Sequence, residues 1–215
     1  LLDEVLKYLP EPEAEDEDDD TIKVALIGKP NVGKSSLLNA ISRSRRAIVT
    51  DIPGTTRDTV EEYVNVKGIA LKLIDTAGIR KSGKIEDKIE KYSVLRAEMA
   101  VDRSDVCIIM IDASEGVTEQ DTKVAGIAHD AGKACVIVVN KWDLVEKDDK
   151  TMKKMEEDIR RDLSYMTYAP IIFISAKTGQ RIDEVFSKIK YVNEQNCMRI
   201  STGVLNDILV DATTK

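Results

Sequence analysis

Four continuous apolar segments recur along the chain at intervals that leave room for helices. Runs of this length, bounded by polar residues, are typical of strands that are buried on both faces of a sheet. The segments are IKVALI at 22–27, VCIIMID at 106–112, ACVIVVN at 134–140 and PIIFISA at 170–176. They predict the interior of a parallel sheet.

Two further segments, VEEYVNVK at 60–67 and IALKLID at 69–75, alternate between apolar and polar residues around Gly68. They predict a hairpin. Helical spacing of apolar residues predicts helices near 34–42, 87–102, 118–132, 151–164 and 180–192. Six strands, with one antiparallel edge strand and helices on both faces, predict a three-layer α/β domain over 21–192.

Both ends of the chain carry further amphipathic helices. An apolar stripe over 1–9 stops at Pro10, and Ser201 is a candidate cap for a helix with an apolar stripe from Val204 to Leu209. We expect each to be the edge of a neighbouring domain, so that the chain is a fragment. The alternative is that both helices dock on the central domain.

The net charge of −7 comes from one short segment. Residues 11–20, EPEAEDEDDD, contain eight acidic residues and no basic one, and without them 32 basic residues face 31 acidic residues. This composition predicts a disordered acidic linker at 10–20. The near-neutral remainder argues neither for nor against a nucleic-acid partner.

The cysteines show no metal-ligand spacing, and the apolar surroundings of Cys107 and Cys135 predict buried free thiols. His129 is the only histidine, which excludes a histidine cluster, and we expect it to be solvated on a helix. No apolar run is long enough for a membrane helix, and no signal peptide is visible. Reduced cysteines without a signal peptide indicate the cytoplasm.

The sequence GKPNVGKS at 28–35 matches the phosphate-binding P-loop pattern between a predicted strand and a predicted helix. Glycines allow main-chain N–H groups to surround phosphate oxygens, and the helix N-terminus adds partial positive charge. Lys34 is expected to reach the β- and γ-phosphates, and the Ser35 hydroxyl to bind Mg²⁺. The expected phosphate contacts are Gly28, Lys29, Pro30, Asn31, Val32, Gly33, Lys34, Ser35 and Ser36.

The sequence NKWD at 140–143 selects the base. The Asp143 carboxylate can accept hydrogen bonds from N1–H and the 2-amino group of guanine, whereas adenine has neither donor, so the carboxylate would stay unpaired. The stem of Lys141 can cover the face of the base, and Trp142 is expected to pack in the core. The expected base contacts are Asn140, Lys141, Asp143, Ser175, Ala176 and Lys177, with the Ala176 N–H facing guanine O6.

A polar loop at 50–58, TDIPGTTRD, is expected to supply a second hydroxyl for Mg²⁺. Thr56 is the first candidate and Thr55 the second. Asp75 ends a predicted strand and is expected to hold Mg²⁺ through water. The Gly78 N–H is expected to meet the γ-phosphate, so the candidate catalytic residues include Thr56 and Gly78 beside Lys34.

Together these motifs resemble a GTPase of the Era/TrmE/Der group. The stretch EGVTEQDTKVAGIAHDAGKACVIVVNKWDLVEKDDKTM narrows the resemblance to the Der (EngA) family, bacterial tandem GTPases of 50S ribosomal subunit assembly. The resemblance implies the P-loop GTPase fold, GTP and GDP as ligands, and the 50S subunit or its precursor as partner. It also implies that 1–9 ends a first G domain, that 21–192 is the second, and that 193–215 begins a truncated KH-like domain.

The resemblance also bears on Ile79, which stands where Ras-like switches carry a glutamine that orients the attacking water. In the related GTPase TrmE, a K⁺ ion beside the phosphates replaces an arginine finger. By that resemblance Asn31 is a catalytic K⁺ ligand, with Thr50, Ile52 and Thr55 as the loop ligands. Asn31 as a plain turn residue is the alternative.

Other interpretations stay open. Arg57 and Arg80 are candidates for arginine fingers within the chain, although solvated loop positions suit them as well. A tRNA-modifying GTPase is the nearest competing function, but it predicts a carboxyl-terminal helix that ends in a cysteine motif, which this chain lacks. A nucleotide-dependent interaction module without turnover is the third interpretation.

Overall fold

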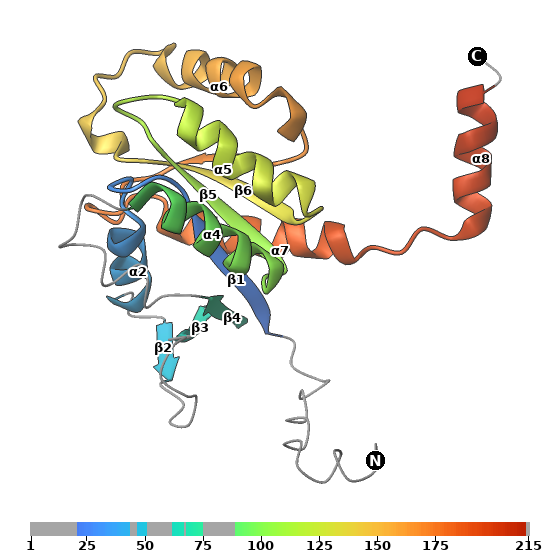
Figure 1. The fold of residues 1–215 in the computed structure, drawn as a ribbon, viewed down its shortest axis with the longest axis horizontal. Coiled ribbons are helices and arrows are strands. Elements are labelled where there is room, and N and C mark those ends of the chain that lie inside the picture. Colours follow the sequence, from blue (N-terminus) through green and yellow to red (C-terminus); the bar gives the residue numbers. More distant parts are fainter. Residues whose placement is uncertain (1–20, 44–46, 51–61, 67, 75–88, 214–215) are drawn as a thin grey trace, which may run out of the picture.

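The computed structural model describes residues 21–43, 47–50, 62–66, 68–74 and 89–213. Within these ranges one sheet of seven strands forms the middle layer, in the order β2-β3-β4-β1-β5-β6-β7 (Figure 1). The strands are β1 Ile22–Ile27, β2 Ala47–Thr50, β3 Glu62–Val66, β4 Ile69–Ile74, β5 Val106–Asp112, β6 Ala134–Asn140 and β7 Ile171–Phe173.

The predicted fold class is confirmed, with one correction at the edge of the sheet. Strand β1 is parallel to β4 and β5, and the parallel arrangement continues through β6 to β7. Strand β3 is antiparallel to β4, as the hairpin predicts, but it is not the edge strand because β2 pairs with its other side. The sequence prediction missed β2 because four residues beside a polar loop carry too little periodicity to identify a strand.

The helices lie close to their predicted positions. They are α2 Lys34–Arg43, α4 Ile89–Asp102, α5 Glu119–Asp130, α6 Thr151–Asp162, α7 Ile182–Cys197 and α8 Thr202–Thr213, with short 3₁₀ helices at Trp142–Leu144 and Ser164–Met166. Helix α5 begins at a capping box in which Thr118 and Asp121 exchange hydrogen bonds. Helix α7 continues five residues beyond the predicted end at 192.

Two apolar layers hold the domain together. Leu37 of α2 and Phe186 of α7 pack on one face of the sheet, and both side chains are almost completely buried. Ala125 of α5 and Ile159 of α6 pack on the other face, beside α4 (Figure 1). Burial on both faces explains why β5 and β6 are apolar up to their last residues, Asp112 and Asn140.

The cysteine prediction is confirmed, whereas the histidine prediction needs correction. Cys107 and Cys135 are buried opposite each other on β5 and β6 as free thiols. His129 lies on α5 but is half-buried rather than solvated. Its ring stacks on Tyr168, tilts against Tyr165 and shares a hydrogen bond of 3.2 Å with the Tyr168 hydroxyl. The sequence could not show these contacts, because both tyrosines lie more than 30 residues away and meet His129 only in the folded domain.

Helix α8 stands apart from the layered domain (Figure 1). None of its residues is buried, and Val204, Leu205, Ile208 and Leu209 are all about half exposed. For this helix the structure therefore contradicts docking on the central domain, while the predicted helix at 1–9 lies outside the described residues. Among the helices that the structure describes, none combines the length and apolar character needed to cross a membrane.

Candidate functional site

The loop between β1 and α2 has no room for a side chain at either of its two motif glycines. Gly28 has φ +149°, and a Cβ there would lie 2.7 Å from the carbonyl oxygen of Met110. Gly33 has φ +100°, and a Cβ there would overlap the Asn140 side-chain amide. Both glycines are therefore required by close approach as well as by backbone conformation, as a phosphate-binding loop requires.

The other loop positions differ in exposure. Pro30 and Asn31 are exposed, whereas Val32 is buried in the core. Asn31 has φ +63°, a left-handed conformation that asparagine tolerates better than most residues. Asn31 also lines the cavity described below, so the structure is compatible with both sequence interpretations, a turn residue and an ion ligand.

Lys34 fills the centre of the loop. Its ammonium donates hydrogen bonds to the carbonyl oxygens of Gly28 and Lys29, at 2.5 and 2.6 Å. Burial lowers the pKa of Lys34 to about 8, although the negative charge of Asp121 acts to raise it. A cation held in this way lies where a bound phosphate would offer it stronger acceptors than the two carbonyl groups.

The side chain of Lys29 points away from the loop. Its ammonium lies 2.7 Å from Oε2 of Glu115 and 3.4 Å from Oδ2 of Asp121. This leaves only the Lys29 main chain for the predicted phosphate contact. Ser35 and Ser36 follow in the first turn of α2, where both are exposed.

Asn140 connects the predicted phosphate-binding half of the site to the predicted base-binding half. It is 2% exposed, and its side-chain amide donates to the Val32 carbonyl oxygen at 2.8 Å. Its Oδ1 accepts the Ala176 N–H at 3.0 Å. Asn140 therefore joins the P-loop to the loop after β7, and the predicted contact of Ala176 with guanine O6 would require this N–H to be shared between two acceptors.

Asp143 and Ser175 meet at the other end of the site. The Ser175 hydroxyl donates to Oδ1 of Asp143 at 2.6 Å and lowers the pKa of Asp143 below its usual value, with help from the charges of Lys177 and Lys147. The lowered pKa keeps Asp143 ionised, and its side chain lines the cavity described below. Trp142 beside it is 3% exposed and packs on Phe173 with ring centroids 4.6 Å apart, which confirms the predicted packing role.

Lys141 is held by a residue that the sequence analysis missed. Its ammonium pairs with Oδ2 of Asp112 at 2.5 Å, while Oδ1 of Asp112 accepts the N–H and hydroxyl of Ser114. Burial acts to raise the pKa of Asp112, but these hydrogen bonds outweigh it and leave the pKa below its usual value. The available signal was its position as the last residue of β5, at the edge of the sheet where ligands bind.

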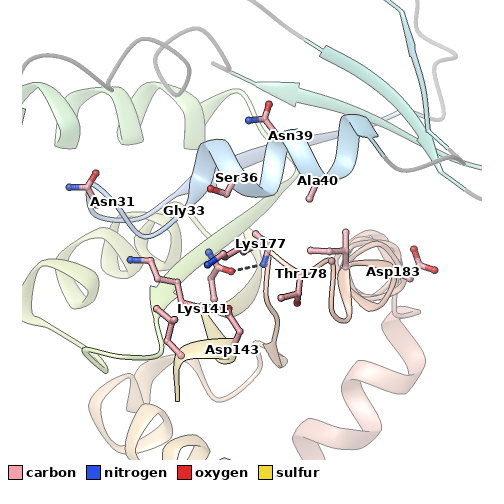
Figure 2. A pocket seen from close by; sticks show the side chains of 15 residues that line it. Asn31, Gly33, Ser36, Asn39, Ala40, Lys141, Asp143, Lys177, Thr178 and Asp183 are labelled. Carbon is pink, nitrogen blue, oxygen red and sulfur yellow. Dashed lines mark hydrogen bonds between the residues drawn. The ribbon is translucent and has the colours of Figure 1, made fainter. Parts of the chain in front are cut away.

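A cavity of about 720 Å³ joins these groups. Figure 2 shows Gly33 and Ser36 on the side of the P-loop, facing Lys141, Asp143 and Lys177 across the cavity. A cavity of this size is within the range of small-molecule sites. The structure thus brings together the predicted phosphate end and the predicted base end.

Several predicted residues lie outside the described residues. These are Ile52, Thr55, Thr56, Asp75 and Gly78, and of Thr50 only its place at the end of β2 is described. Their roles stay predictions. The described residues contain no group of three or more His, Cys, Asp or Glu side chains suited to a metal. Ser35 is nevertheless an exposed hydroxyl beside the loop, which fits Mg²⁺ held mainly by phosphates and water.

Comparison with known proteins agrees with this geometry. A family model described as 50S ribosome-binding GTPase matches residues 23–141. The GTPase Der of Acetivibrio thermocellus is 59% identical over 213 residues, 99% of this chain and 48% of the relative. The GTPase Der of Heliobacterium modesticaldum is 56% identical over 211 residues, 98% of this chain and 48% of the relative. The chain thus spans about half the length of the curated relatives it matches.

Solved structures show the same architecture. Aquifex aeolicus Era bound to GDP·AlF4⁻ is 30% identical, with a TM-score of 0.60 over 80% of this chain and 56% of that chain. Elongation factor SelB from Methanococcus maripaludis, in complex with a GTP analogue, has a TM-score of 0.60 at 22% identity, over 84% of this chain and 35% of that chain. The second likeness concerns the fold alone.

Proposed function

Since the chain belongs to the 50S ribosome-binding GTPase family, we propose that its central domain binds GTP and GDP and hydrolyses GTP to GDP and phosphate. The observation that carries this proposal is the continuous cavity that runs from Gly33 to Asp143 and Lys177. One wall offers main-chain N–H groups and a helix N-terminus, which suit phosphates. The other offers an ionised carboxylate, which suits a base with two adjacent donors.

Guanine selectivity is assigned to Asp143. Its carboxylate is ionised and keeps one oxygen for N1–H and the 2-amino group, while Ser175 fixes the other. The stem of Lys141 covers the base because Asp112 holds its ammonium in place. Adenine would leave the carboxylate unpaired, which is the basis of strong discrimination.

The phosphates are assigned to the P-loop. Lys34 exchanges its two carbonyl partners for the β- and γ-phosphates, and the main-chain N–H groups from Asn31 to Ser35 surround the phosphate oxygens. Mg²⁺, when bound, neutralises charge on the phosphates. The Ser35 hydroxyl would hold it, with Thr56 and Asp75 as the further proposed ligands.

Hydrolysis is assigned to groups that position water and stabilise charge. We assign the γ-phosphate contact to the Gly78 N–H. Because Ile79 has no polar atom to orient water, backbone groups and a bound ion would place the attacking water. Asn31 supports a bound K⁺ beside the phosphates, since it is exposed on the loop and lines the cavity. Relatives named GTPase Der, at 53–59% identity, favour this function over that of a tRNA-modifying GTPase.

The proposed setting is assembly of the 50S subunit in the cytoplasm, with the subunit or its precursor as partner. The relatives are about twice as long as this chain, which supports further domains beside it. In this proposal 1–9 belongs to a preceding G domain and 10–20 is the acidic linker. The exposed apolar face of α8 supports a neighbouring domain at this end, which we assign to a truncated KH-like domain over 193–215.

Nucleotide selectivity and turnover test the enzymatic proposal together. Isothermal titration should show GDP binding at least ~100-fold tighter than ADP, since the carboxylate would stay unpaired beside adenine. Phosphate release should require GTP and Mg²⁺ rather than ATP. Lys34→Ala serves as the matched control, because it removes the central cation while the surrounding glycines stay in place. Equal affinity for GDP and ADP, or phosphate release unchanged in the control, would contradict the assignment.

A further inference from the structure

The phosphate loop has a backbone that must be held in place. Gly28, Asn31 and Gly33 all have positive φ, at 149°, 63° and 100°. Sparsely populated backbone conformations persist only where the surrounding structure fixes them. Asn140 fixes the far end of the loop through its hydrogen bond to the Val32 carbonyl oxygen, but this contact does not reach the start of the loop.

Lys29 provides an anchor at the start of the loop. It is 8% exposed although it carries a charge, and its ammonium lies between Glu115 and Asp121. Glu115 is at the surface, with 56% of its side chain exposed, whereas the side chain of Asp121 is completely buried. The ion pair joins the P-loop to the first turn of α5, more than 80 residues away in the sequence.

The capping role of Asp121 does not account for its charge. Its Oδ2 accepts the N–H and the hydroxyl of Thr118, which completes the capping box. Its Oδ1 is buried and has no hydrogen-bond partner among the described residues. A neutral amide oxygen would cap the helix as well, and a buried carboxylate is costly unless a cation is beside it. This charge acts on two lysines, since it opposes the lowering of the Lys34 pKa and pairs directly with Lys29.

We propose that Asp121, assisted by Glu115, is a positioning residue that holds the start of the phosphate loop through Lys29 and thereby sets the affinity for nucleoside di- and triphosphates. Asp121 does not touch the nucleotide. It acts because main-chain N–H groups bind phosphate well only when they are already pointed at it. This inference rests on the proposed function, since it concerns the same GTP and GDP site.

A double-mutant cycle on GDP affinity tests the anchor. The variants are Asp121→Asn, Lys29→Met and the two combined, with isothermal titration of GDP and the melting temperature without nucleotide as readouts. We expect GDP affinity to fall about 10-fold in Asp121→Asn and at least as far in Lys29→Met. The double variant should lose no more than Lys29→Met alone, because the asparagine removes the unpaired buried charge.

Thr118→Ala is the matched control, since it removes the capping partner and leaves the ion pair intact. It should lower the melting temperature as much as Asp121→Asn while GDP affinity stays within twofold of the unmodified protein. An equal loss of affinity in this control would assign the effect to capping and overturn the proposal. Losses that multiply in the double variant would overturn it as well, because they would show that the two residues act independently.

The test still gives a clear answer if a variant fails to fold. It also distinguishes failure of the anchor from failure of the proposed function. If Asp121→Asn does not fold, Lys29→Met and Glu115→Gln carry the test, and GDP affinity within twofold of normal in both overturns the anchor. GDP binding by the unmodified protein with unchanged affinity in Asp121→Asn overturns only this inference. Absence of GDP binding by the unmodified protein overturns the proposed function and the inference with it.

Discussion

Replacing Asp143 with asparagine should change which base the site accepts. In the proposed complex the carboxylate would face guanine with one oxygen, while the other accepts the Ser175 hydroxyl at 2.6 Å. The asparagine side chain would keep one acceptor oxygen but turn an amide donor toward a donor of guanine. Xanthine carries an oxygen at position 2 in place of the amino group, so the same amide would meet an acceptor.

The magnitude follows from the bonds that are lost. Hydrogen bonds to charged groups contribute about 1.5–3 kcal/mol each, and two are lost with guanine. Asp143 is only half-buried, so the lower end applies, and a loss of about 3 kcal/mol corresponds to roughly 100-fold weaker binding of GDP. Binding of XDP should improve by a comparable factor.

Isothermal titration of GDP and XDP with Asp143→Asn measures both changes. Ser175→Ala is the matched control, because it removes the hydroxyl but keeps the carboxylate, so it should retain the preference for guanine. If Asp143→Asn keeps its GDP affinity and gains none for XDP, the assignment of Asp143 as the base-reading residue is wrong.

Five further predictions concern other parts of the domain. Lys34→Ala should weaken GTP binding about 30- to 100-fold, from the loss of charged hydrogen bonds worth about 2–3 kcal/mol, and Ser35→Ala should raise the Mg²⁺ concentration needed for turnover; titration of nucleotide and of Mg²⁺ checks each. Asp112→Asn should weaken the binding of GDP and of GTP by the same factor, about 5-fold, because it releases the partly exposed Lys141 ammonium, which lies near the base and not near the phosphates; unequal losses would contradict this role. Asn31→Ala should abolish most stimulation of turnover by K⁺ over Na⁺ at equal ionic strength while GDP affinity stays unchanged, and identical turnover of the unmodified protein in both salts would refute the ion. A chain of residues 21–197 should bind GDP within twofold of the whole chain, and an insoluble or non-binding product would show that the ends complete the core.

Much of the fold and of the site could be predicted because the relevant signals are local. Strands β5 and β6 are apolar up to their last residues since both faces are covered, and the P-loop pattern by itself specifies the two glycines at which the backbone has positive φ. The motifs at 28–35 and 140–143 each lie at the carboxyl end of a buried strand. Parallel strands bring these ends to one edge of the sheet, so the two halves of the site were expected to meet.

The contacts that hold the motifs in place could not be predicted, because they depend on tertiary proximity. Nothing in the sequence near Lys29 shows that its side chain turns to Glu115 and Asp121 rather than to the phosphates. The pairing of Asp112 with Lys141 is hidden in the same way. Even the short strand β2 becomes a strand only because β3 is available beside it.

These contacts share one feature that bears on the role of the domain. Asn140, Asp112 and Asp121 are each no more than 2% exposed, and each joins two segments that line or support the nucleotide cavity. The partners named above all lie between residues 29 and 176, within the layered domain. The base end and the phosphate end are therefore held by the domain's own interior rather than by α8. We therefore expect the proposed neighbouring domains to respond to the bound nucleotide rather than to be needed for the cavity to form.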